Sequence, residues 1–177
     1  MNTPLPKRIV ASALPGEALS VRQPWAWAII FGGKTIENRT ASAIRAGRMR
    51  PGPIALHAAR GMTEREYRWG AWKLAQIGVH CPLPADLPRG AIIGAVDVTD
   101  IITDSDSPWF GGPRGLVLAN PRSCDPIPAT GALGYFAWEA AGSALAPTPW
   151  MRRYTEASLF DTLPLGFETP PAKPFPK

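Results

Sequence analysis

Residues 19–40 read LSVRQPWAWAIIFGGKTIENRT, and this stretch predicts a strand, a helix and a second strand in succession. Its first residues predict a short strand over Leu19–Arg22. Pro24 suits the first position of a helix, and the glycine pair that begins at Gly32 ends that helix. The alternation in Thr35–Arg39 predicts the second strand. A glycine turn therefore joins an apolar helix to a polar strand.

That turn and the strand after it carry three charged residues, Lys34, Glu37 and Arg39, in a G-x-K-x-x-E-x-R arrangement. Because successive strand residues point to opposite faces, Glu37 and Arg39 share one face. A solvated strand edge with a surface ion pair is the simplest interpretation of this pattern. The alternative is a site that gathers charge for binding or catalysis.

The remaining sequence predicts one long helix and several short strands. Thr63 and Glu66 form a T-x-x-E capping box, and apolar residues then recur at helical intervals as far as Gly78. Further strands are expected at Ile54–Ala58, Gly90–Thr103, Leu116–Ala119 and Tyr135–Trp138.

Long connections separate these elements. Thr40–Pro53 is expected as a basic loop, Asp104–Gly115 as an acidic loop, and residues 120–134 as a series of turns. Strands and helices do not alternate regularly, which argues against a parallel βαβ sheet. The pattern instead predicts a mixed α/β, mainly β fold, with a small, partly closed barrel and two or more helices beside it.

The length of 177 residues corresponds to one domain. Hydrophobic residues make up 45% of the chain, enough for a core, while 21 prolines and 17 glycines predict many turns. We expect the domain to occupy residues 17–162, between an N-terminal tail at 1–16 and a Pro-rich tail at 163–177.

Charge is distributed unevenly along the chain. Residues 1–89 carry 13 basic and 5 acidic side chains, whereas residues 90–177 carry 6 basic and 9 acidic ones. No acidic residue lies between Asn38 and Thr63, although five arginines do. This segment predicts a positive face, which suits a polyanionic partner but also serves solubility alone.

Several classes of protein are not indicated. Cys81 and Cys124 lie outside any disulfide or zinc spacing, and the aspartates of residues 97–106 lack the glycine and closing glutamate of a calcium loop. We expect no metal site and no cofactor. No secretory signal or apolar run long enough for a membrane helix is present, so the sequence predicts a cytoplasmic protein without a membrane partner.

Taken together, several blocks resemble the ASCH family, the activating signal cointegrator homology domains of the PUA-like superfamily. The resemblance covers about residues 18–138. Its blocks are Gln23-Pro24-Trp25, the G-x-K-x-x-E-x-R turn, Ile54–Ala59, Ile92–Asp100, Gly115–Pro121 and Gly131–Trp138. It implies a PUA-like β-barrel with helices against it and a cleft beside the glycine turn for RNA, a nucleotide or a modified base. Activities in the family range from RNA binding and coactivation to single-strand ribonuclease and acetylcytidine amidohydrolase action.

Residue chemistry agrees with a cleft of nucleobase size. Lys34 is a compact cation for a phosphate or carbonyl oxygen, and Glu37 can accept a hydrogen bond from an exocyclic amine. Arg39 would steady that carboxylate. Trp25 and either Trp109 or Phe110 offer planes on which an unpaired base stacks, although Trp25 suits core packing equally well.

Other candidates also have a structural interpretation. Gln23, Asn38 and Asn120 are able to read base edges but also suit turns and caps. His57 lies within an apolar strand, where a hydrogen-bonded core histidine is the commoner case. Its expected nearness to Lys34 keeps it as a candidate catalytic base.

The leading hypothesis is therefore a protein that binds single-stranded RNA or a modified nucleoside. The alternative is a metal-independent hydrolase. The family's acetylcytidine amidohydrolases carry a threonine three residues after the lysine, where this chain has Glu37; Lys34 and Glu37 would then act as oxyanion stabiliser and general base. A ribonuclease would use Lys34 with His57. A third hypothesis is a protein-interaction module that uses the Pro-rich segment from Leu163.

Overall fold

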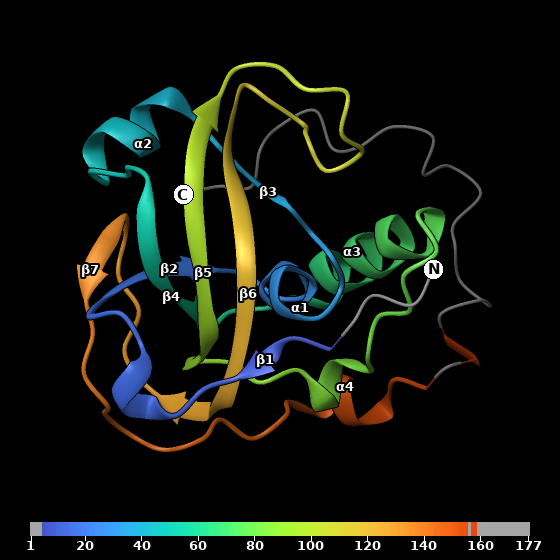
Figure 1. The fold of residues 1–177 in the computed structure, drawn as a ribbon. Helices are drawn as coiled ribbons and strands as arrows, with labels where there is room; N and C mark the ends of the chain where they lie inside the picture. The colour runs from blue at the N-terminus through green and yellow to red at the C-terminus, as the bar shows by residue number, and fades with distance from the viewer. Residues whose placement is uncertain (1–4, 156, 159–177) are drawn as a thin grey trace.

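The computed structural model describes residues 5–155 and 157–158 of the chain. One sheet dominates the fold (Figure 1). Its seven strands are β1 (Lys7–Arg8), β2 (Glu17–Val21), β3 (Ile36–Arg39), β4 (Gly52–Ala58), β5 (Ala91–Ile102), β6 (Arg114–Pro128) and β7 (Tyr135–Ala137). The fold is therefore mixed α/β and mainly β.

The helices are short, apart from one. They are α1 (Trp25–Ile30), α2 (Ala41–Ala46), α3 (Glu64–Gln76) and α4 (Pro149–Arg153), with 3-10 turns at Ala11–Ala13 and Pro84–Asp86. The predicted capping box is present at α3, where Thr63 Oγ1 accepts from the Glu66 amide and the Glu66 carboxylate accepts from the Thr63 amide. In the described part of the chain, no helix has the length and apolar character needed to cross a membrane.

The strand order is β1-β6-β5-β4-β2-β7, and β3 also pairs with β6. β3 pairs with the first half of one β6 edge and is antiparallel to it, whereas β1 pairs with the second half of that edge and is parallel to it. β2 and β4 form a second parallel pair near the other end of the sheet. No backbone ladder joins β3 to β2 among the described residues, so the closed barrel that the resemblance implied is not observed. The pairings instead form an open sheet.

A side chain spans the two edges that a closed barrel would join. Arg39, at the end of β3, donates from Nη2 to the carbonyl oxygen of Ser20 in β2 at 2.8 Å. β7 pairs only with Glu17, Ala18 and Leu19 of β2, so Ser20 lies just beyond its coverage. Arg39 therefore links the unpaired edges of β3 and β2, and we call the position between these edges the seam of the sheet.

The main core fills one face of the sheet. Apolar residues of α1, β2, β4, β5 and β6 pack together there, and the fully buried members include Leu19, Ile29, Leu56 and Leu116. A second cluster lies among α1, α3 and α4. A third, smaller cluster of Ala18, Ala55, Ile92 and Ala129 occupies a separate position.

Three predicted segments differ from the structure. The expected loop at Thr40–Pro53 contains α2, because Thr40 Oγ1 caps it by accepting from the Ala43 amide. The expected turns after Asn120 are part of the continuous strand β6, whose pairing with β5 absorbs three register shifts. Lys7–Arg8, expected in a tail, pairs with β6 as β1. The Pro-rich segment at 163–177 lies outside the described residues.

Candidate functional site

The glycine turn after α1 places Lys34 at the seam. Gly33 has a φ of 71°, a conformation that favours glycine, and the Lys34 amide donates back to the Ala28 carbonyl oxygen at 3.0 Å. A Cβ on Gly32 would lie 2.9 Å from the Ala28 Cα. Both glycines are therefore needed to turn the chain tightly from α1 into β3.

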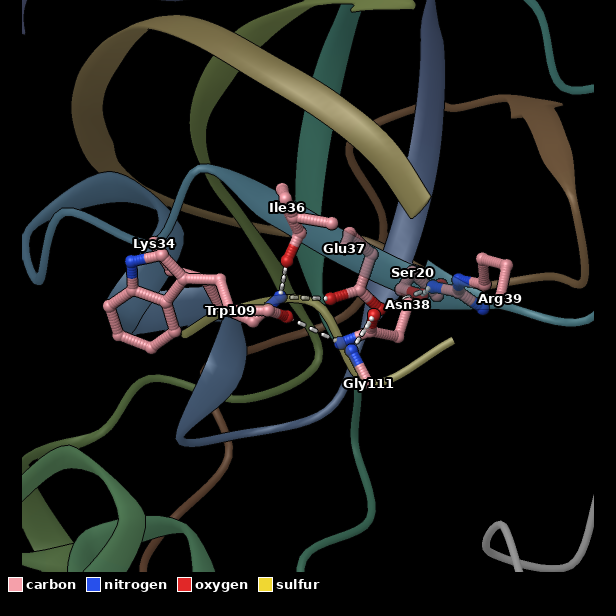
Figure 2. A network of polar contacts seen from close by, with 8 residues as sticks. All are labelled: Ser20, Lys34, Ile36, Glu37, Asn38, Arg39, Trp109 and Gly111. Carbon is pink, nitrogen blue, oxygen red and sulfur yellow. Dashed lines mark hydrogen bonds and ion pairs between the residues drawn. The ribbon is translucent and has the colours of Figure 1, made fainter. Parts of the chain in front are cut away.

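Lys34, Glu37 and Arg39 form one hydrogen-bonded network (Figure 2). Lys34 Nζ donates to the Ile36 carbonyl oxygen and, at 2.9 Å, to Glu37 Oε2. Arg39 Nη2 lies 3.3 Å from Glu37 Oε1. Lys34 is only 5% exposed, whereas the Arg39 side chain is 23% exposed, so the network opens to solvent at its Arg39 end.

The Glu37 carboxylate is held in its ionised form. Burial raises its pKa, but the neighbouring charges of Lys34 and Arg39 lower it by more, so the pKa falls below the ordinary 4.5. The three side chains together carry a net positive charge of one. The predicted sharing of one face by Glu37 and Arg39 is confirmed by their contact, while the surface interpretation of the pattern is wrong because the ion pair is buried.

Asn38 points to the other face of β3 and holds the 107–111 loop. Its Nδ2 donates to the Trp109 carbonyl oxygen at 2.8 Å, and its Oδ1 accepts from the Gly111 amide at 2.8 Å. Figure 2 shows both bonds beside the ion network. The amide that was predicted to read a base is therefore engaged in positioning the aromatic loop.

The aromatic candidates are only partly exposed. Trp109 packs on the cluster between α1 and α3, and the Phe110 ring lies close to Gly115 of β6. Trp25 meets Trp69 edge to face, with ring centroids 5.4 Å apart. The core interpretation therefore accounts for Trp25, and the Trp109–Phe110 loop is the aromatic segment adjoining Asn38 of β3.

Gln23 and Asn120 are hydrogen-bonded internally. Gln23 is fully buried; its Nε2 donates to the Pro88 carbonyl oxygen and its Oε1 accepts from the Trp27 amide. Asn120 donates to Asp97 across the β5–β6 pair. The structure does not bring either residue into the Lys34 network.

His57 is a buried, hydrogen-bonded histidine. Its Nε2 lies 3.1 Å from the Ala129 carbonyl oxygen, which only accepts, so Nε2 carries the proton and Nδ1 accepts from Ser20 Oγ at 2.8 Å. Its ring meets Phe136 edge to face. These contacts fit the structural interpretation, and neither ring nitrogen is directed to Lys34.

This burial predicts a pH-dependent stability. Burial lowers the pKa of His57 below the ordinary 6.5, although the bond to Ala129 opposes the shift. The unfolded chain therefore takes up this proton first, and the free energy of unfolding should fall as pH drops below 6.5 towards the lower pKa of the folded state. Urea unfolding between pH 5 and pH 8 should show this slope in wild type and His80→Gln but not in His57→Gln. An equal slope in His57→Gln would contradict the assignment.

One residue at this site was not predicted from the sequence. Arg114, the first residue of β6, pairs in register with Arg39, just as Leu116 pairs with Glu37. Directly opposed residues of an antiparallel pair point to the same face, so Arg114 lies on the face that carries Glu37 and Arg39. The sequence did not indicate this position, because Arg114 was expected in the acidic loop at 104–115. The strand register places it opposite Arg39.

A shallow hollow adjoins the glycine turn, where the cleft was predicted. Its walls are mostly apolar and include Gly33, Lys34, Thr35, Leu118, Ala119 and Pro121. Within residues 5–155 and 157–158, no cluster of histidine, cysteine or acidic residues could hold a metal ion. The site is thus a buried ion network with a small apolar depression beside it.

The fold and the site together describe a mainly β domain that carries a buried charged network at the seam of its sheet. The family model for the ASCH domain matches residues 19–167, and the chain belongs to this family. A search of curated proteins found no match.

Proposed function

We propose that this domain binds single-stranded RNA, or a nucleotide of the same chemistry, at the seam between β3 and β2. The observation that carries the proposal is the Lys34–Glu37–Arg39 network, in which an ionised carboxylate lies between two cations and opens at Arg39. Such a carboxylate can accept from an exocyclic amine of a base, while the net positive charge attracts phosphate. Membership of the ASCH family supports the same ligand class.

Basic side chains continue from the network onto α2. Arg45 lies in the last turn of this helix and Arg48 follows the helix, and both are exposed. Neither guanidinium has an ion pair or hydrogen bond among the described residues. They follow Arg39 within a few residues, so they extend the positive charge outward along the surface.

Binding of labelled oligonucleotides at low salt tests the proposal. We expect wild type to bind single-stranded RNA, and Arg45→Gln/Arg48→Gln to bind more weakly. If each arginine neutralises one phosphate, the slope of log affinity against log salt should fall by about 1.4. Arg152→Gln/Arg153→Gln removes the same charge from α4, which lies at the opposite end of the fold from α2 (Figure 1), and should retain wild-type binding.

The same assay compares cytidine-rich with uridine-rich oligonucleotides. Cytosine presents an exocyclic amine to a carboxylate, whereas uracil presents a carbonyl oxygen, so the cytidine-rich strand should bind about 5-fold to 100-fold more tightly. Failure of wild type to bind either strand at low salt would overturn the proposed function. An equal loss of RNA affinity in the two double variants would show that the α2 surface does not take part in binding.

Hydrolysis is the less supported alternative. The lowered pKa of Glu37 makes it a weak general base, and Lys34 already donates to Glu37 and Ile36. Both ring nitrogens of His57 have internal partners. Incubation of the pure protein with acetylcytidine and with single-stranded RNA distinguishes the two functions, since a binding protein leaves both substrates intact.

A further inference from the structure

We infer that Arg39 and Arg114 form a subsite for a phosphate group at the mouth of the seam. This inference rests on the proposed function and specifies which part of a nucleic acid binds at the Arg39 end of the network. No carboxylate in the described part of the chain forms an ion pair with Arg114, whereas Glu37 pairs with Arg39.

The register of the sheet opposes two positive charges. Arg39 and Arg114 are direct partners in the antiparallel β3–β6 pair, where opposed Cβ atoms lie about 4.5–5.5 Å apart. Two rows deeper along the same face, Glu37 is opposite Leu116, which is fully buried. The arginine pair is therefore the outermost level of a face whose inner level is core.

Like charges placed directly opposite each other are destabilising unless something neutralises them. Glu37 neutralises part of the charge at Arg39, but the Arg114 side chain has no hydrogen bond or ion pair within residues 5–155. The loop before β6 carries Asp104 and Asp106, both exposed, and neither pairs with Arg114. With Lys34 included, the four charged side chains at the seam sum to two positive charges.

Arg39 is also incompletely satisfied. Its Nη2 serves Ser20 and Glu37, but its buried Nε has no acceptor. Buried donors without partners are rare in folded proteins, and each one calls for a physical explanation. A tetrahedral oxyanion accepts several guanidinium donors at once, so phosphate matches both the charge and the donor surplus.

Two sources supply this chemistry, the internal phosphodiester of an RNA strand and the terminal phosphate of a nucleotide. The variant Arg114→Gln distinguishes them, with Arg65→Gln as a matched control, because Arg65 is an exposed arginine of α3 without a partner in the described chain. Affinity is measured for oligonucleotides with and without a 5′-phosphate, and for cytidine beside cytidine 5′-monophosphate.

An internal phosphodiester in the subsite predicts that Arg114→Gln weakens binding of every oligonucleotide and lowers the salt slope by about 0.7. A terminal phosphate predicts a loss of about 10-fold, confined to the 5′-phosphorylated ligands. Either result supports the subsite. Identical binding by Arg114→Gln and Arg65→Gln for all ligands would overturn it.

Inorganic phosphate tests the subsite independently of RNA. In ¹H–¹⁵N spectra, the Nε–H signals of Arg39 and Arg114, assigned with Arg39→Lys and Arg114→Lys, should shift saturably with phosphate but not with chloride at equal ionic strength. If RNA fails to bind while these shifts occur, the subsite stands and the proposed function fails. If RNA binds but phosphate moves neither signal and Arg114→Gln binds like Arg65→Gln, the proposed function stands and the subsite fails.

Discussion

Lys34→Met should lower the free energy of unfolding by about 3–5 kcal/mol, measured by urea denaturation at pH 7. The variant removes the nearest cation from Glu37, a carboxylate that is only 9% exposed, and leaves it with Arg39 as its one charged partner in the described part of the chain. It also removes the donor to the Ile36 carbonyl oxygen. Methionine fills a similar volume, so the loss reports the uncompensated charge rather than a cavity.

The double variant Lys34→Met/Glu37→Gln supplies the control. Neutralising Glu37 removes the buried charge that Lys34 no longer compensates, and we expect this variant to recover part of the lost stability. Acid provides a second check. Because the folded-state pKa of Glu37 is lowered from 4.5, its ionised form stabilises wild type above that pH, and this contribution is lost as pH falls through the lower value. The difference in the free energy of unfolding between wild type and Lys34→Met should therefore become smaller in acid. If Lys34→Met lost less than about 1 kcal/mol of the free energy of unfolding, and this loss did not vary with pH, the network would be solvated rather than buried.

This stability role affects how binding experiments should be designed. A loss of RNA binding in a Lys34 variant would mix altered folding with altered recognition, because Lys34 is buried within the network. Arg45, Arg48 and Arg114 carry no internal ion pair in the described chain, so their substitution changes the charge offered to a ligand with little change to the fold. These arginines are the more informative positions for testing function.

The elements that local sequence signals specify were predicted well. Pro24 and the glycine pair at residues 32 and 33 delimit α1, and the Thr63–Glu66 capping box begins α3. The predictions failed where distant residues override local preference. The prolines near Asn120 signal turns, yet the long pairing with β5 keeps this segment in β6 and accommodates it with register shifts.

The candidate site shows the same division. The pattern placed Glu37 and Arg39 on one face, since alternation along a strand is a local property. The distant partners of Gln23 and Asn38 are Pro88, Trp109 and Gly111, which lie 65 to 73 residues away along the chain, and no spacing rule indicates them. Likewise, Arg114 becomes a neighbour of Arg39 only through the β3–β6 register.

Gly94→Ala should cost about 3 kcal/mol or more of the free energy of unfolding, because the added methyl group meets backbone on one side and a helix on the other. Its Cβ would lie 2.1 Å from the Arg122 carbonyl oxygen and 3.0 Å from Ile30 Cδ1 of α1. Carbonyl oxygen in a paired strand cannot rotate away, so β5 and β6 must separate where register shifts flank Gly94 on both sides. Gly16→Ala is the matched control, since no atom lies within 4 Å of its added Cβ, and urea unfolding should place it within about 0.5 kcal/mol of wild type. Equal stabilities for the two variants would contradict this close approach of β5 to β6 at Gly94.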